Sequence, residues 1–221
     1  MGLLQKVLYK LAGTSEEVQK IYTEKGLCPE YVEAYHALHP KPKTFDKCLI
    51  ADMYLAIDQF DKAGEILDSI HIGFMSDDDE KGMYYYVLMN YLMLTKRKDE
   101  AISILKREQK YLNIYWGSPG RARFCGAFYD CVATLSSACG YSDIANYYYQ
   151  LEQAANAKYD RTGLMSPISK LNILYAAKSP EADAQVEPIR QQIEAYNDYK
   201  NVWEKDYFLK LLEKAKRFAE L

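Results

Sequence analysis

The sequence is poor in the residues that interrupt regular structure and in those that most often build reactive sites. It contains 7 Pro and 11 Gly among 221 residues, so long uninterrupted elements are expected. Its five Cys are odd in number and form no Cys-x-x-Cys pair, which excludes a disulfide scaffold and a zinc ribbon. Of the three His, His36 and His39 are close in sequence but have no third ligand nearby. We therefore expect no metal site and no cofactor.

Neither sign of charge dominates, and no apolar run is long. The 28 Lys and Arg nearly balance the 31 Asp and Glu, which argues against binding to nucleic acid or to an anionic membrane. The most apolar stretch, Met83 to Leu94, is too short to cross a bilayer and contains Asn90. The N-terminal residues are too polar for a signal peptide, and their apolar positions predict a short amphipathic helix: Leu4, Val7, Leu8 and Leu11. We expect a cytoplasmic protein.

Hydrophobic residues are abundant and follow a helical period. They make up 49% of the chain, which is enough for a sizeable core and excludes disorder. Apolar positions recur every three to four residues, and no run alternates as a strand would, so the predicted fold class is all-α. We expect a long helix from about Arg121 to Cys139, and a helical tail from Val186 to Leu221 in two pieces that meet near Asn197. Helix starts are expected near these residues: Ser15, Pro29, Thr44, Asp61, Ser76, Asp99 and Asp143.

A short pattern, Asp-x-Ala, recurs along the chain and predicts repeated helix pairs. The Ala residues stand at 63, 101 and 145, and a weaker fourth copy places Ala184 in the same role. We expect the small Ala to allow close approach of the second helix of each pair to the first. We expect the preceding Asp61, Asp99 and Asp143 to cap these second helices.

The stretch from Leu49 to Leu67 resembles the tetratricopeptide repeat (TPR) family. The residues that carry the resemblance stand where the family has large, small, Tyr, aromatic, Ala and large residues: Ile50, Ala51, Tyr54, Phe60, Ala63 and Leu67. Later copies keep part of this pattern: Leu88, Leu92, Ala101 and Leu105, then Val132, Ala133, Ala145 and Tyr149. The steps exceed the family's repeat of about 34 residues, and the closing Pro is absent. The resemblance covers about residues 44–157 and extends more weakly to 198.

This resemblance implies one TPR-like domain over residues 1–221, built as a right-handed helical-repeat solenoid of antiparallel helix pairs. The expected parts are N-terminal helices, four pairs and a C-terminal capping helix: 1–40, 44–70, 80–112, 121–157, 166–198 and 199–221.

The resemblance also implies that the first helix of each pair lines a concave groove for an extended or helical peptide. The groove residues that we predict by family position are Asp52, Tyr86, Asn90, Met93, Asp130 and Thr134. The family's clamp for chaperone C-terminal carboxylates uses basic residues, where this chain has Cys48, Tyr86 and Asp130. We therefore expect no chaperone-tail binding.

Asn90 and the two Tyr runs can each be interpreted in two ways. Asn90 lies in an apolar helix and must be hydrogen-bonded if it is buried. It is expected either to clamp a bound peptide backbone, or to be simply exposed or satisfied within its own repeat. The Tyr runs 84–86 and 147–149 cannot all face the core, so some of these Tyr are expected to be exposed. Exposed Tyr suits an interface, whereas packing between helices with wet hydroxyls is the alternative.

These patterns favour a binding protein over an enzyme. The loop from Gly117 to Arg121 lacks the ending of a phosphate loop, and no pair of carboxylates stands out as acid and base. The leading hypothesis is a scaffold or adaptor for a protein or peptide partner. The alternatives are a signalling regulator similar to bacterial peptide sensors with TPR-like domains, and a self-assembling module that forms a homo-oligomer.

Overall fold

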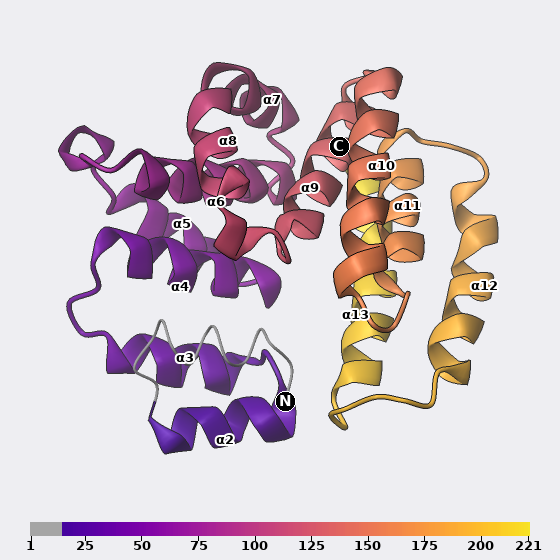
Figure 1. Cartoon of the computed structure of the whole chain (residues 1–221), viewed down its shortest axis with the longest axis horizontal. Coiled ribbons are helices and arrows are strands. Elements are labelled where there is room, and N and C mark those ends of the chain that lie inside the picture. The colour runs from indigo at the N-terminus through magenta and orange to yellow at the C-terminus, as the bar shows by residue number, and fades with distance from the viewer. Residues whose placement is uncertain (1–14) are drawn as a thin grey trace.

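The computed structural model describes residues 15–221, and the regular structure of that part of the chain is entirely helical. The predicted all-α class is confirmed. The amphipathic helix expected around Leu4 and Leu11 lies outside the described residues. The α-helices, labelled in Figure 1, are α2 (Glu16–Lys25), α3 (Pro29–Leu38), α4 (Thr44–Ala56), α5 (Phe60–Asp68), α6 (Asp78–Leu94), α7 (Lys98–Arg107), α8 (Gln109–Gly117), α9 (Cys125–Ala138), α10 (Ser142–Tyr159), α11 (Met165–Ala176), α12 (Ala182–Ala195) and α13 (Glu204–Ala215). Short 3-10 segments are η1 (Ile72–Phe74), η2 (Pro119–Arg121) and η3 (Lys216–Glu220).

Several helix starts follow from local chemistry. The Ser15 hydroxyl accepts a hydrogen bond from the Val18 amide at 3.3 Å, which satisfies one of the free amides at the start of α2. Pro29 occupies the first turn of α3, where its missing amide costs nothing. Asp77 caps α6 by accepting from the Asp79 amide at 2.8 Å. These starts confirm the sequence predictions to within two residues.

The first helices of four successive pairs, α4, α6, α9 and α11, end in the same left-handed turn. The residue at the turn has a positive φ each time: Asp58 61°, Lys96 65°, Gly140 78° and Lys178 55°. The next amide then reaches back over the turn, as in the bonds from Gln59 N to Tyr54 O and from Arg97 N to Leu92 O, at 2.9 and 2.8 Å. This is the hydrogen bond of a Schellman C-cap. Its recurrence reveals an internal repeat at the level of the backbone.

The second helices begin differently from the prediction. Asp61, Asp99 and Asp143 lie in the first turn, and none of them is the N-cap residue. The cap positions are occupied by Gln59, Arg97 and Tyr141, with no side-chain cap hydrogen bond. The Schellman turn fixes the chain so that each helix starts earlier than the Asp. The Asp side chains are left to interact with the positive end of the helix dipole.

The close-packing role of Ala holds in three copies and shifts in the fourth. Ala63, Ala101 and Ala145 are buried, as predicted. Ala184 is exposed, and Ala182 is buried instead. The reason is that α12 begins four residues after the left-handed turn at 178, whereas the other second helices begin two residues after theirs.

Helix α8 is an additional element between the second and third pairs, and the sequence analysis missed it. It packs against α6, where Gly82 allows the approach: a Cβ on Gly82 would lie 2.3 Å from the Tyr111 main-chain oxygen. The insertion of α8 explains why this repeat step is the longest. The predicted long helix from Arg121 begins only at Cys125, after the η2 turn.

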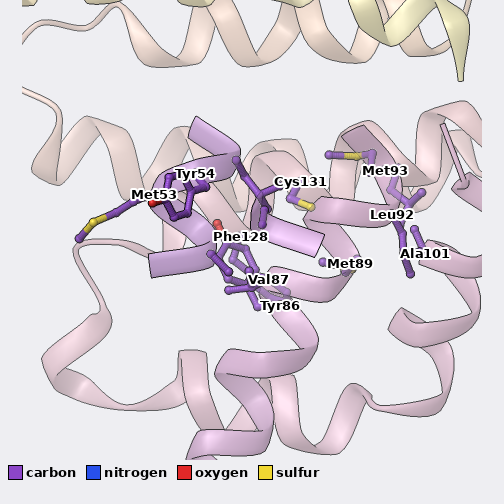
Figure 2. Packing of buried hydrophobic residues seen from close by; sticks show 14 of the residues in the cluster. Met53, Tyr54, Tyr86, Val87, Met89, Leu92, Met93, Ala101, Phe128 and Cys131 are labelled. Atoms are coloured by element: carbon purple, nitrogen blue, oxygen red, sulfur yellow. The ribbon is translucent and has the colours of Figure 1, made fainter. Parts of the chain in front are cut away.

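The Tyr run on α6 contradicts the expected exposure, whereas the run on α10 agrees with it. All of Tyr84, Tyr85 and Tyr86 are buried, because α6 is covered by α4, α5, α7, α8 and α9. Figure 2 shows Tyr86 beside Phe128 in this buried cluster, and their ring centroids are 6.3 Å apart. Tyr147 on α10, by contrast, is 57% exposed.

The first and second helices of each pair pack together, and the first helices contact one another in chain order: α4 with α6, α6 with α9, and α9 with α11. We call α4, α6, α9 and α11 the first-helix layer. The tail forms two helices, as predicted, and α13 packs against both α11 and α12. In Figure 1, α13 starts at the level of α2 and leads to the C-terminal end beside α9.

Candidate functional site

The predicted groove residues all lie on the first-helix layer, but they differ in accessibility. They are distributed as Asp52 on α4, Tyr86, Asn90 and Met93 on α6, and Asp130 and Thr134 on α9. Met93 and Thr134 are 4% and 1% exposed, and Tyr86 is also buried. These three belong to the core, so their assignment as direct peptide contacts is corrected. Asp52, Asn90 and Asp130 remain partly exposed.

Asp52 is the most unusual carboxylate of the layer. Within residues 15–221 its side chain forms no hydrogen bond and no ion pair. Burial raises the pKa of Asp52 to about 6, because the charged form loses hydration and gains no partner. This carboxylate is therefore held in an environment that favours a hydrogen-bond donor or a cation beside it.

The charge of Asp52 acts on Tyr86 of the neighbouring helix α6. Burial raises the pKa of the Tyr86 hydroxyl well above its usual range, and the negative charge of Asp52 raises it further. The side chain of Asn90, one turn further along α6, lowers this pKa. Asn90 is half-buried, so its interaction with a peptide backbone stays a prediction.

Asp130 is already engaged by its neighbours. It accepts from Thr134 Oγ1 at 3.4 Å and from Asn172 Nδ2 at 3.2 Å, so it joins α9 to α11. Burial raises the pKa of Asp130 to about 6, and the hydrogen bonds from Asn172, Ser169 and Thr134 oppose that shift. Asp130 is therefore a structural acceptor first, with less capacity than Asp52 to bind a partner.

A fully buried carboxylate, Glu152 on α10, was missed by the sequence analysis. It is 1% exposed and accepts from Ser166 Oγ at 3.0 Å, from Ser169 Oγ at 2.9 Å and from Asn156 Nδ2. Burial raises the pKa of Glu152 to about 7, and the charge of Asp130 adds to the shift while the serine hydrogen bonds oppose it. The sequence around Glu152 gives no signal that this side chain is buried. Of its three donors, only Asn156 lies on the same helix, and Ser166 and Ser169 lie on α11.

The layer offers polar recognition rather than a nucleophile. Burial and the negative charges of Asp130 and Asp52 raise the pKa of the Cys131 thiol on α9 well above the ordinary value. Such a thiol stays protonated and unreactive. In the described part of the chain, no group of three or more His, Cys, Asp or Glu side chains could hold a metal ion.

Two surface clefts lie away from the predicted residues. One of about 360 Å³ lies among α5, α6 and α7 and includes Tyr91, Arg97 and Glu100. The other, of about 240 Å³, lies among α10, α11 and α12 and includes Tyr149 and Lys170. None of the six predicted groove residues lines either cleft, so the candidate site is a surface of the first-helix layer.

Comparison with protein-family models, with curated proteins and with solved structures gives no match. The TPR resemblance therefore depends on the residues of this chain and on their arrangement. None of the helices in residues 15–221 combines the length and the apolar character that a membrane span requires.

Proposed function

We propose that the chain is a TPR-like helical-repeat protein that binds a protein or peptide through its first-helix layer. Three features support this architecture. The same Schellman turn ends each of four first helices. Each second helix has a buried Ala, at the predicted position in three pairs and two residues earlier in the fourth. The first helices also contact one another in chain order, as a stacked repeat requires.

The observation that carries the binding proposal is the half-buried Asp52 carboxylate on α4, which makes no hydrogen bond or ion pair within the described chain. Partial burial raises its pKa, so a donor that reaches it would stabilise the charged form. A Lys, an Arg or a backbone amide of a bound segment would supply that donor. The binding partner is therefore expected to be basic or rich in exposed donors where it contacts α4 and α6.

The test is affinity capture followed by direct titration of each captured protein. Wild type is compared with Asp52→Asn, which keeps the shape and removes the charge. The matched control is Asp61→Asn, the same change at an exposed site on α5. Tyr86→Ala is unsuitable, because Tyr86 is buried and its loss would leave a cavity. We expect a partner whose affinity falls about tenfold with Asp52→Asn alone, the range for one charge-assisted hydrogen bond. Equal binding by all three proteins would contradict the proposal.

A specific observation favours self-assembly as a second candidate. Tyr141, Ile144 and Tyr147 are exposed and recur every three residues at the start of α10, on one side of the helix. Large exposed apolar side chains gathered on one surface often mark a protein interface. Size-exclusion chromatography with light scattering measures the oligomeric state. A wild-type dimer that Tyr147→Ser converts to a monomer would support self-assembly. A wild-type protein that stays monomeric up to about 100 μM would exclude it.

A further inference from the structure

The last 19 residues form a segment that crosses the ends of the first-helix layer. We call residues 203–221, which include α13 and η3, the strap. At its start, the Trp203 ring packs edge-on against Tyr22 of α2, with centroids 5.4 Å apart. Gly26, at the end of α2, makes room for it, because a Cβ there would lie 2.5 Å from the indole ring. The strap therefore begins at the N-terminal end of the described chain.

In its middle, the strap is held by a single acidic residue. Lys214 Nζ lies 2.7 Å from the Asp58 carboxylate and donates to the Ala56 main-chain oxygen at 3.0 Å. Arg217 donates to the other carboxylate oxygen of Asp58 at 2.8 Å. Asp58 is the left-handed residue that ends α4. Two strap cations thus bind the C-terminal end of the first helix of the first pair.

The end of the strap reaches the turn after α6 and is linked through Lys98 to the end of α9. Glu220 forms an ion pair with Lys96, the left-handed residue that ends α6. Lys98 Nζ donates both to the Leu221 main-chain oxygen at 2.9 Å and to the Ala138 oxygen at the end of α9 at 3.2 Å. The strap also packs along α11. It therefore contacts α4, α6 and α11 or the turns that end them, and Lys98 of α7 links its C-terminal end to the end of α9.

The strap has the pattern of a helix that docks into a groove. Its buried residues recur at spacings of four, three, three and three: Phe208, Leu212, Ala215, Phe218 and Leu221. An amphipathic helix bound in a groove shows this spacing of apolar anchors. Its flanking cations face the acidic turn at Asp58.

The docking of the strap leaves polar groups unsatisfied. Within the described chain, Trp203 Nε1 and Arg217 Nε are buried without a hydrogen-bond partner. Burial lowers the pKa of Arg217, which shows that the charge is poorly solvated there. Gln59 Oε1, next to Asp58 in sequence, is also buried without a partner. Each unsatisfied group weakens the association, because its hydration is lost and not replaced.

We propose that the strap is an intramolecular ligand that occupies the docking site of an amphipathic, basic helix of a partner protein. This inference rests on the proposed binding function and names its chemistry. The partner helix presents apolar anchors at the spacing of the strap and two cations for Asp58. A partner with an additional donor would also satisfy Asp52, which the strap leaves without a hydrogen bond. The partner helix can then bind only after the strap is released. The fraction of molecules with a released strap therefore limits the apparent affinity for the partner helix.

The test uses the full chain and a labelled synthetic peptide with the sequence of residues 203–221. In the opened variant, Lys214→Glu with Arg217→Glu, the strap is repelled by Asp58 while the layer is unchanged. The matched control, Lys210→Glu with Lys216→Glu, makes the same charge change at two exposed strap positions without ion pairs in the described chain. We expect fluorescence anisotropy to show peptide binding at least about tenfold tighter to the opened variant than to wild type or the control.

A charge-swap variant checks that the cause is the Asp58 contact. Adding Asp58→Lys to the opened variant restores opposite charges, and Lys is accepted at this left-handed position in the turns at 96 and 178. We expect hydrogen exchange of residues 204–220 to be fast in the opened variant and slow again in the charge-swap variant.

Several outcomes would overturn the proposal. Equal peptide affinity in the opened variant and wild type would show that the strap does not compete. Loss of helical circular dichroism in the opened variant would make the strap an integral part of the fold. Dimers that exchange straps, seen by light scattering, would replace the partner helix with a second copy. Failure of the peptide test while an Asp52-dependent partner persists would refute the strap inference and leave the proposed function standing. Because the strap leaves Asp52 without a hydrogen bond, we expect Asp52→Asn to leave the affinity of the strap peptide unchanged; a marked loss would contradict this docking geometry.

Discussion

Replacing Glu152 by Gln should make the protein more stable at alkaline pH. Glu152 is buried among Asn156, Ser166 and Ser169, and its pKa is raised to about 7 from an ordinary value of 4.5. Gln has the same shape, and its oxygen can still accept from Asn156 and Ser169. Its amide group can donate to Ser166, whose hydroxyl is able to accept as well as donate.

The direction in which stability changes with pH follows from the pKa of Glu152 in the folded and in the unfolded chain. The unfolded chain ionises Glu152 above about pH 4.5, whereas the folded chain does so only near pH 7. Between these values the folded state holds the extra proton, so the contribution of Glu152 to stability falls as pH rises and then stays low. At about 1.4 kcal/mol per pH unit, this pKa difference predicts a loss of about 2 kcal/mol between pH 5 and pH 8 once residual solvent screening is included.

Urea unfolding at pH 5 and pH 8 measures this difference. We expect Glu152→Gln to remove about 2 kcal/mol of the wild-type loss of stability between the two pH values. The remaining pH dependence comes from other groups with raised pKa values, such as Asp52 and Asp130. The control is Glu194→Gln, the same substitution at an exposed position of α12. Its stability at pH 5 and at pH 8 should equal that of wild type.

A parallel pair of profiles for wild type and Glu152→Gln would refute the reasoning. It would mean that Glu152 keeps its ordinary pKa in the folded protein. If the parallel profile of Glu152→Gln also lay lower at both pH values, the substituted amide would in addition satisfy the serine and asparagine neighbours less well than the carboxyl group does.

Two further predictions concern the close approaches and turns of the repeat. Gly82→Ala should destabilise the protein by more than about 2 kcal/mol in thermal or urea unfolding, because the new Cβ would lie 2.3 Å from the Tyr111 oxygen. Gly73→Ala in η1, where a Cβ would have nothing within 4 Å, is the control and should change stability by less than about 0.5 kcal/mol. Gly140→Ala should cost about 1 kcal/mol by the same measurement, since φ is 78° and no contact opposes the methyl group. A neutral effect of Gly140→Ala would show that the Schellman turn after α9 is not needed for stability.

The individual helices were predictable because their signals are local. Pro29, Thr44 and the acidic start of α6 lie at or within two residues of observed starts. The Asp-x-Ala repeat located the turns between paired helices, although it misassigned the cap. That error arises because the cap geometry is set by the preceding left-handed residue, which Asp58, Lys96 and Lys178 occupy without the glycine that usually marks it.

The candidate site was predictable only in part. The resemblance to the TPR family implied that Asp52, Asn90 and Asp130 lie on first helices, and they do. It could not show that Met93 and Thr134 are buried by neighbouring helices or that α8 covers Tyr85, because an inserted helix changes which faces of α6 meet solvent. Glu152 was invisible for the same reason, since its donors Ser166 and Ser169 lie on the next helix.

By itself the sequence determined an all-helical chain with repeated pairs, because caps, turns and apolar periodicity act over a few residues. The tertiary structure alone decided which carboxylates are desolvated and where the strap lies. Both depend on contacts between residues far apart in the chain, such as Arg217 with Asp58 and Trp203 with Tyr22. Burial by distant segments sets the pKa of Asp52 and Glu152, and no local pattern encodes that burial.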